Sequence, residues 1–265
     1  MRRSRRTQTS KKADAMAWQT EFLRVTAFPI SGASDLLPNS WKQITGNDPD
    51  EISKHPPPIQ SFEAGPFFGG RLSVGHQPGR IDLVSMPDQT TQSEGAQQLR
   101  HIGDFGLAME NMLPAARKMF RPDMAMQRLA VGAVIFYPVE STEDGYKVLR
   151  SILPVAREIP ETASDFSLQV NVPVSLSVTG IGEIRINRLL RWNVARFQIM
   201  NMVGGSGIPT QIVGGIETHA VRVEMDINTP ADLATPLSYQ NILDVIDYLA
   251  SMARAIAANR GWFPQ

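Results

Sequence analysis

Apolar and polar residues alternate most regularly between Asp165 and Val178, where the sequence reads DFSLQVNVPVSLSV. Every second residue from Phe166 onwards is apolar, and those between are polar apart from Pro173. Because successive side chains of a strand point to opposite faces of a sheet, the pattern predicts a strand with one face on a core. Strands buried on both faces read as continuous apolar runs, so we expect an antiparallel or mixed sheet. Pro173 cannot donate a ladder hydrogen bond, which predicts an edge position or a break.

Other segments repeat the strand pattern. Arg71–Met86 reads as a hairpin, because Pro78 and Gly79 supply the fixed φ and the positive φ of a type II turn. The alternation resumes from Ile184 to Val194, and its apolar parity changes near Ala195, which predicts a β-bulge. The remaining strands are expected at Trp18–Ile30, Met126–Tyr137 and Ile216–Ile227.

Two segments have the spacing of three or four residues that marks the apolar face of a helix. Gly95–Phe120 is expected to form a long helix that Pro114 bends or breaks, because proline lacks the N–H that would bond one turn back. Tyr239–Arg260 is the second helix, with Ser238 as its N-cap and Gly261 in the left-handed position after its last turn.

These elements place the chain in the α+β class. We expect an antiparallel or mixed sheet of about 6–8 strands with the two long helices packed on its apolar face. Residues 31–70 are rich in proline and lack a regular pattern, so they are expected to be loop lying along the body. Residues 1–16 have no apolar period and predict a disordered basic tail, which leaves residues 17–265 as a single α+β domain.

The composition limits the functions that the chain can have. It has 265 residues, of which 42% are hydrophobic and 20% charged, as in ordinary globular proteins. The absence of cysteine excludes disulfides, thiol nucleophiles and cysteine-based zinc sites, and favours a cytoplasmic location. No apolar run approaches the roughly 18 residues of a membrane helix, so no membrane contact is expected.

Basic residues gather at the N-terminus, although the whole chain has a net charge of zero. Six of the 26 basic residues fall within the first twelve positions, where no acidic residue occurs, so the rest of the chain carries about −6. Clustered arginine and lysine can bind nucleic acid through its phosphates. A solvated tail without function is the simpler interpretation, and a targeting segment is the third. The candidate contacts are Arg2, Arg3, Arg5, Arg6, Lys11 and Lys12.

The densest polar block in a strand pattern runs from Glu183 to Asn193. Asparagine disfavours strands, and lysine would solubilise a strand as well as arginine, so this composition favours binding of a phosphate, a carboxylate or a partner strand. The alternative is an exposed face held by cross-strand bonds. The candidate binding residues, which share one parity, are Asn171, Arg185, Asn187, Arg191 and Asn193.

The other chemical patterns are weaker. Glu224 and Asp226 share a strand face about 6.6 Å apart by strand rise and would suit acid–base chemistry, but neighbouring Arg222 favours an ion-pair ladder. The glycines of residues 204–207 lack the following helix that a phosphate-binding loop needs, and indicate a hairpin tip. No metal or cofactor is expected, because the histidines have no ligand spacing. They are His55, His76, His101 and His219.

The sequence therefore favours a non-enzymatic binding or assembly subunit that uses the Arg/Asn-rich sheet face to contact a protein partner or a second copy of itself. Two alternatives stay open. One is an enzyme that uses Glu224 and Asp226, and the other is a nucleic-acid accessory protein that uses the basic tail.

Overall fold

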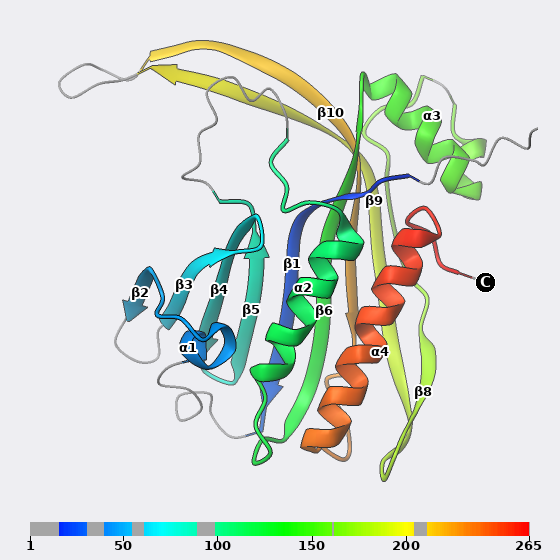
Figure 1. Ribbon diagram of the computed structural model, residues 1–265. Coiled ribbons are helices and arrows are strands. Elements are labelled where there is room, and N and C mark those ends of the chain that lie inside the picture. Colours follow the sequence, from blue (N-terminus) through cyan, green and yellow to red (C-terminus); the bar gives the residue numbers. More distant parts are fainter. Residues whose placement is uncertain are drawn as a thin grey trace, which may run out of the picture.

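The computed structural model describes residues 16–30, 40–54, 61–88, 99–160, 162–203 and 211–264. Within these ranges, ten antiparallel strands form one sheet in the order β2-β3-β4-β5-β1-β6-β10-β9-β7, and β8 pairs with β9 next to β7 (Figure 1). The strands are β1 Gln19–Pro29, β2 Glu51–Lys54, β3 Ser61–Phe67, β4 Gly70–Gln77, β5 Arg80–Met86, β6 Met126–Val139, β7 Ser167–Asn171, β8 Val174–Val178, β9 Gly182–Val203 and β10 Gln211–Asn228.

The helices of the described ranges all pack on the same face of this sheet. Helices α2 and α4 contact each other and cover β1, β6 and β10, while α1 lies over β3 and β4 and α3 over β9 and β10 (Figure 1). No helix formed by these residues lies on the opposite face, which we call the helix-free face. The helices are α1 Ser40–Thr45, α2 Phe105–Lys118, α3 Thr142–Ile152 and α4 Tyr239–Ala258, with a 3-10 helix, η2, at Pro154–Glu158.

The α+β class is confirmed, but the sheet is larger than the expected 6–8 strands. Two of the additional strands, β2 and β3, lie in residues 31–70, which the proline content had marked as loop. Pro66 is accommodated in β3, near the edge of the sheet, where missing ladder bonds cost least. The alternating segment 165–178 supplies two strands, β7 and β8, which are separated at Val172 and Pro173. Proline therefore breaks the strand as expected.

The first long helix is shorter than its apolar spacing suggests. Its expected start at Gly95 lies outside the described residues, and α2 begins only at Phe105, because residues 99–104 are not helical and hydrogen-bond to the backbone at the start of β1. Asp104 caps the helix through its carboxylate. Pro114 lies inside α2 without ending it.

The bulge expected near Ala195 is not present. This residue pairs in regular register with Ala220, and the register shift between β9 and β10 falls between Ile212 and Gly214. The two strands continue beyond the rest of the sheet as a long two-stranded arm (Figure 1). The parity change reflects this departure from the helix-covered core, because a strand outside the core has no face that must stay apolar.

The core lies between the sheet and the helices, and the end of α4 closes it. Ser238 occupies the N-cap of this helix as expected, although its side chain makes no capping hydrogen bond. Gly261 has a φ of +78°, as expected for the turn after the helix. The chain then returns so that the Trp262 ring lies 4.9 Å from that of Trp192, which is fully buried.

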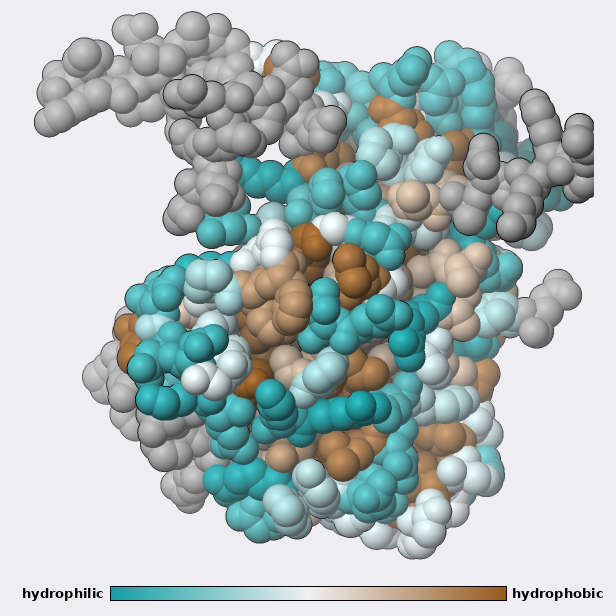
Figure 2. Space-filling model, in the orientation of Figure 1, coloured by the Kyte–Doolittle hydropathy of each residue, from teal (hydrophilic) through white to brown (hydrophobic). Residues whose placement is uncertain are grey.

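The helix side of the molecule shows hydrophilic residues interspersed with apolar patches over α2 and α4 (Figure 2). On this side Arg117 of α2 donates a 3.0 Å hydrogen bond from Nε to Asp247 Oδ1 of α4. The two helices thus share polar contacts outside the core as well as apolar contacts within it.

Candidate binding face

The candidate residues of β9 lie on the helix-free face. Ile184, Ile186, Leu190 and Trp192 point into the core, and Arg188 is buried on the same side. The residues of β9 that alternate with them are exposed or half-buried on the other side, namely Arg185, Asn187, Leu189, Arg191 and Asn193. The neighbouring strands add further polar side chains in register. We call this surface the polar ladder and define it as Gln169, Asn171, Arg185, Asn187, Arg191, Asn193, Arg222, Glu224, Asp226 and Asn228.

Asparagines link three strands of the polar ladder. Asn171 Nδ2 on β7 donates to Asn187 Oδ1 on β9 (3.1 Å), and Asn187 Nδ2 donates to Asn228 Oδ1 on β10 (3.2 Å). Asn228 in turn donates to Asp226 Oδ1 (3.1 Å). Asn171 Oδ1 also accepts from the backbone N–H of Arg188 (3.0 Å). These bonds hold the amide side chains in defined orientations.

A second network joins polar and charged groups from β7 to β1. Arg191 donates from Nε and Nη2 to Gln169 Oε1 (3.0 and 2.6 Å) and lies 3.4 Å from Glu224 Oε2 through Nη1. Arg222 binds Glu21 of β1 at 2.8 and 3.2 Å, and its Nη1 is 3.9 Å from Glu224. Cations and anions therefore alternate across the face.

Arg185 and Asn193 differ from the other candidates. Arg185 faces Ser175 of β8 and is exposed, and Asn193 lies between Ser167 and Arg222. Neither side chain makes a hydrogen bond or ion pair with a residue in the described ranges. Arg185 therefore offers the planar donor set of its guanidinium to another molecule.

The two carboxylates of the enzymatic alternative both lie on the helix-free face. Glu224 contacts two arginines, and Asp226 accepts from Asn228. This arrangement matches the ion-pair ladder that was the simpler interpretation. No observation at these two residues supports acid–base catalysis.

The described residues give no support to the candidate metal-binding and nucleic-acid-binding residues. His76 lies on β4, His219 on β10 and His101 in the segment before α2, and no group of three potential metal ligands occurs in the part of the chain that the structure describes. The basic-tail candidates of residues 2–12 lie outside the described residues, as do His55 and the glycines of residues 204–207. None of the helices in the described ranges is long and apolar enough to cross a membrane.

The sequence patterns did not single out a trough on the other half of the helix-free face. Residues of β1, β3, β4 and β5 line it, and three of them are arginines. The sequence did contain an indication of this surface. On β1 the core residues alternate with residues of the other face, which are Phe22, Arg24, Thr26 and Phe28. The strand order, which brings β5 beside β1, was needed to recognise the site.

Comparison with known proteins identifies no family for this chain. No protein-family model, no curated protein and no solved structure matches it. The functional argument therefore depends on the two surfaces of the helix-free face.

Proposed function

We propose that this chain is a non-enzymatic binding or assembly subunit that associates with a second copy of itself through the polar ladder. The observation that carries the proposal is that Asn171, Asn187 and Arg191 are held by cross-strand hydrogen bonds on the helix-free face, which none of the described helices covers. The Arg191 side chain is still 49% exposed. Side chains that are already ordered lose little conformational entropy when a partner binds, so they favour association.

The charge pattern favours a second copy over a polyanion. A symmetric interface places the same patch on both sides, so a patch of one sign would repel itself. The polar ladder carries Arg185, Arg191 and Arg222 together with Glu224 and Asp226, and it can therefore complement itself. Those same carboxylates would face the phosphates of a nucleic acid unfavourably.

The position of Arg185 at the sheet edge adds to this argument. Within the described ranges β8 pairs only with β9, so β8 has one side along which further backbone groups could pair. Arg185 lies beside this edge and has no hydrogen-bond or ion-pair partner among the described residues. A second copy would reach both the backbone edge and the free guanidinium.

Sedimentation velocity across a concentration series tests the proposal directly. The wild-type chain is expected to form a dimer, and Arg185→Glu should weaken dimerisation at least tenfold, or about 1.4 kcal/mol. The stability of the Arg185→Glu monomer should change by less than about 0.5 kcal/mol, because the arginine makes no bond within the described chain. Arg157→Glu on η2, an exposed arginine on the helix side, is the matched control and should leave dimerisation unchanged.

Two outcomes would overturn this proposal. One is a wild-type chain that stays monomeric throughout the series. The other is a dimer that tolerates both Arg185→Glu and the double change Arg185→Lys with Arg191→Lys, since lysine cannot reproduce the fork of a guanidinium.

A further inference from the structure

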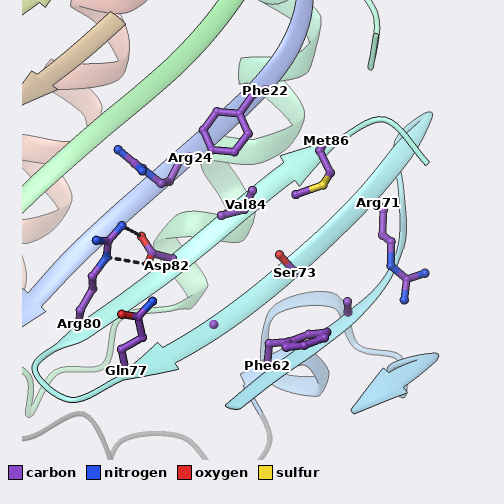
Figure 3. Close-up of a pocket in the computed structure, with 12 residues that line it drawn as sticks. Phe22, Arg24, Phe62, Arg71, Ser73, Gln77, Arg80, Asp82, Val84 and Met86 are labelled. Carbon is purple, nitrogen blue, oxygen red and sulfur yellow. Dashed lines mark hydrogen bonds and ion pairs between the residues drawn. The ribbon is translucent and has the colours of Figure 1, made fainter. Parts of the chain in front are cut away.

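The trough on the helix-free face is a cavity of about 420 Å³, open to solvent and separated from the polar ladder by β6. Figure 3 shows it from the side opposite the helices, with side chains of β1, β4 and β5 forming its floor and Phe62 of β3 at one border. Small-molecule sites in proteins span about 300–1,000 Å³. The trough is therefore large enough for a small ligand, and none of its lining residues belongs to the polar ladder.

Two of the three arginines in the trough have acidic partners within the chain. Arg71 Nη2 lies 2.7 Å from Glu51 Oε2. Arg80 lies 2.6 Å from Asp82 Oδ2 through Nε and donates from Nη2 to Oδ1 (2.9 Å), as the dashed lines in Figure 3 show. Asp82 is therefore already engaged by Arg80, and no ion pair joins it to Arg24.

Arg24 is the third arginine, and it makes no hydrogen bond or ion pair with any described residue. Its Nε is inaccessible to solvent and has no hydrogen-bond partner. The guanidinium carbon lies 5.9 Å from the centre of the Phe22 ring, a contact that orients the cation but leaves its charge uncompensated. A partly buried cation without a partner is costly, and buried polar groups in native proteins are rarely left unsatisfied.

The neighbouring strand leaves space for this guanidinium. Arg24 extends toward β6, where a Cβ added to Gly132 would lie 3.5 Å from Arg24 Nη2. Glycine inside a strand weakens it and often marks a close approach of another group. Asp226, which faces Gly132 from β10, makes no ion pair with Arg24 in the structure. The position thus holds a cation whose counter-ion the described chain does not supply.

The rest of the lining is mainly apolar. Phe22, Val84 and Met86 adjoin Arg24 on β1 and β5, and Phe62 faces them from β3 (Figure 3). A ligand that only carried charge would leave these side chains in contact with water. A ligand with an apolar body and one anionic group would bury them and neutralise Arg24 together.

We infer that the trough binds a small organic anion, such as a carboxylate or sulfonate with an aromatic or aliphatic body. The anionic group binds the terminal nitrogens of Arg24, and the apolar body lies against Phe22, Val84 and Met86. The chain's own basic N-terminal segment has the wrong charge to be this ligand.

Two fluorescent probes that differ by one charged group test this inference on the full chain. 8-Anilinonaphthalene-1-sulfonate is expected to bind one site saturably, and N-phenyl-1-naphthylamine, which lacks the sulfonate, should bind at least tenfold more weakly. Arg24→Gln should remove this preference. Arg128→Gln is the matched control and should preserve it, because Arg128 also lies over a phenylalanine of β1, with its Nε unpaired, but does not line the trough.

A further variant guards against loss of the fold. Ser73→Trp fills the trough from β4 without changing charge and should abolish sulfonate binding while the melting transition persists. Equal binding of the two probes overturns the inference. So does unchanged sulfonate binding in Arg24→Gln or, where that variant fails to fold, in Ser73→Trp.

Discussion

Trp192 Nε1 donates a 2.8 Å hydrogen bond to the backbone carbonyl of Gly261, and both residues are buried although 69 positions separate them. The bond joins the centre of β9 to the turn after α4. Trp262 and Phe263 pack against the same indole, with ring centres 4.9 and 6.1 Å away. The C-terminal turn is therefore fixed to the sheet that carries the polar ladder on its other face.

Trp192→Phe is expected to destabilise the chain by about 2 kcal/mol or more. The change leaves the Gly261 carbonyl without its donor in a buried place, which costs about 1–3 kcal/mol, and it also removes packed ring volume. Equilibrium urea unfolding followed by far-UV circular dichroism measures the loss. Trp262→Phe is the control and should cost less, because that side chain is only half-buried and makes ring contacts alone. Equal losses in the two variants would contradict the assignment.

Local patterns predicted those parts of the fold that local physics determines. The alternation of Ile184, Ile186, Leu190 and Trp192 reported which side of β9 faces the core, because a strand has a period of two. It did not report Arg188, a polar residue that is buried on the core side. Pro173 marked the break between β7 and β8 because it lacks a donor. Gly79 and Gly261 marked turns because both adopt positive φ.

Features that depend on distant residues could not be read in this way. The start of α2 depends on backbone bonds between residues 99–104 and β1, and nothing in the spacing of apolar residues reports those bonds. Strand β2 has four residues and exists only because β3 pairs with it. Arg24 resembled any exposed strand arginine until the structure showed that no carboxylate of the described ranges pairs with it. The binding roles of Asn171, Arg185, Asn187, Arg191 and Asn193 remain predictions for the experiments proposed above.

Two buried threonines on β1 provide a matched test of hydrogen bonding. Thr26 Oγ1 donates to Asp82 Oδ1 (2.6 Å), whereas Thr20 Oγ1 is buried and has no hydrogen-bond partner in the described ranges. Thr26→Val should destabilise the chain by about 1.5–3 kcal/mol, because it removes a hydrogen bond to a charged acceptor. Thr20→Val should be neutral or stabilising, because it removes an unsatisfied hydroxyl of similar shape. Urea unfolding of both variants measures the two losses in stability, and a larger loss for Thr20→Val would contradict this prediction.

His76 is expected to make stability depend on pH. Burial lowers the pKa of this imidazole below its usual 6.5, and the carboxylate of Glu63 opposes the shift without reversing it. Below pH 6.5 the unfolded chain therefore binds more protons at this position than the folded chain, so the free energy of unfolding falls as the pH falls toward the lowered pKa. His76→Gln should flatten this part of the profile. Urea unfolding at several pH values between about 7.5 and 5 measures it, and identical slopes would exclude His76 as the cause.

Gly145 of α3 contacts Val194 of β9 so closely that a Cβ added to the glycine would lie 2.6 Å from Val194 Cγ1. Alanine normally stabilises a helix interior by about 1 kcal/mol relative to glycine. Here the extra methyl group must displace a packed valine, because real Cβ atoms do not approach other atoms so closely. Gly145→Ala is therefore expected to destabilise the chain by about 1–3 kcal/mol, the usual cost of overpacking.

A double-mutant cycle separates this steric effect from any other role of Gly145. Val194→Ala removes both methyl groups that the new side chain would meet, at 2.6 and 3.0 Å. In that background Gly145→Ala should regain the helical preference for alanine and become neutral or stabilising. The expected coupling energy exceeds about 1 kcal/mol, well above the few tenths seen for independent sites. Additive losses would show that the contact between α3 and β9 does not require glycine.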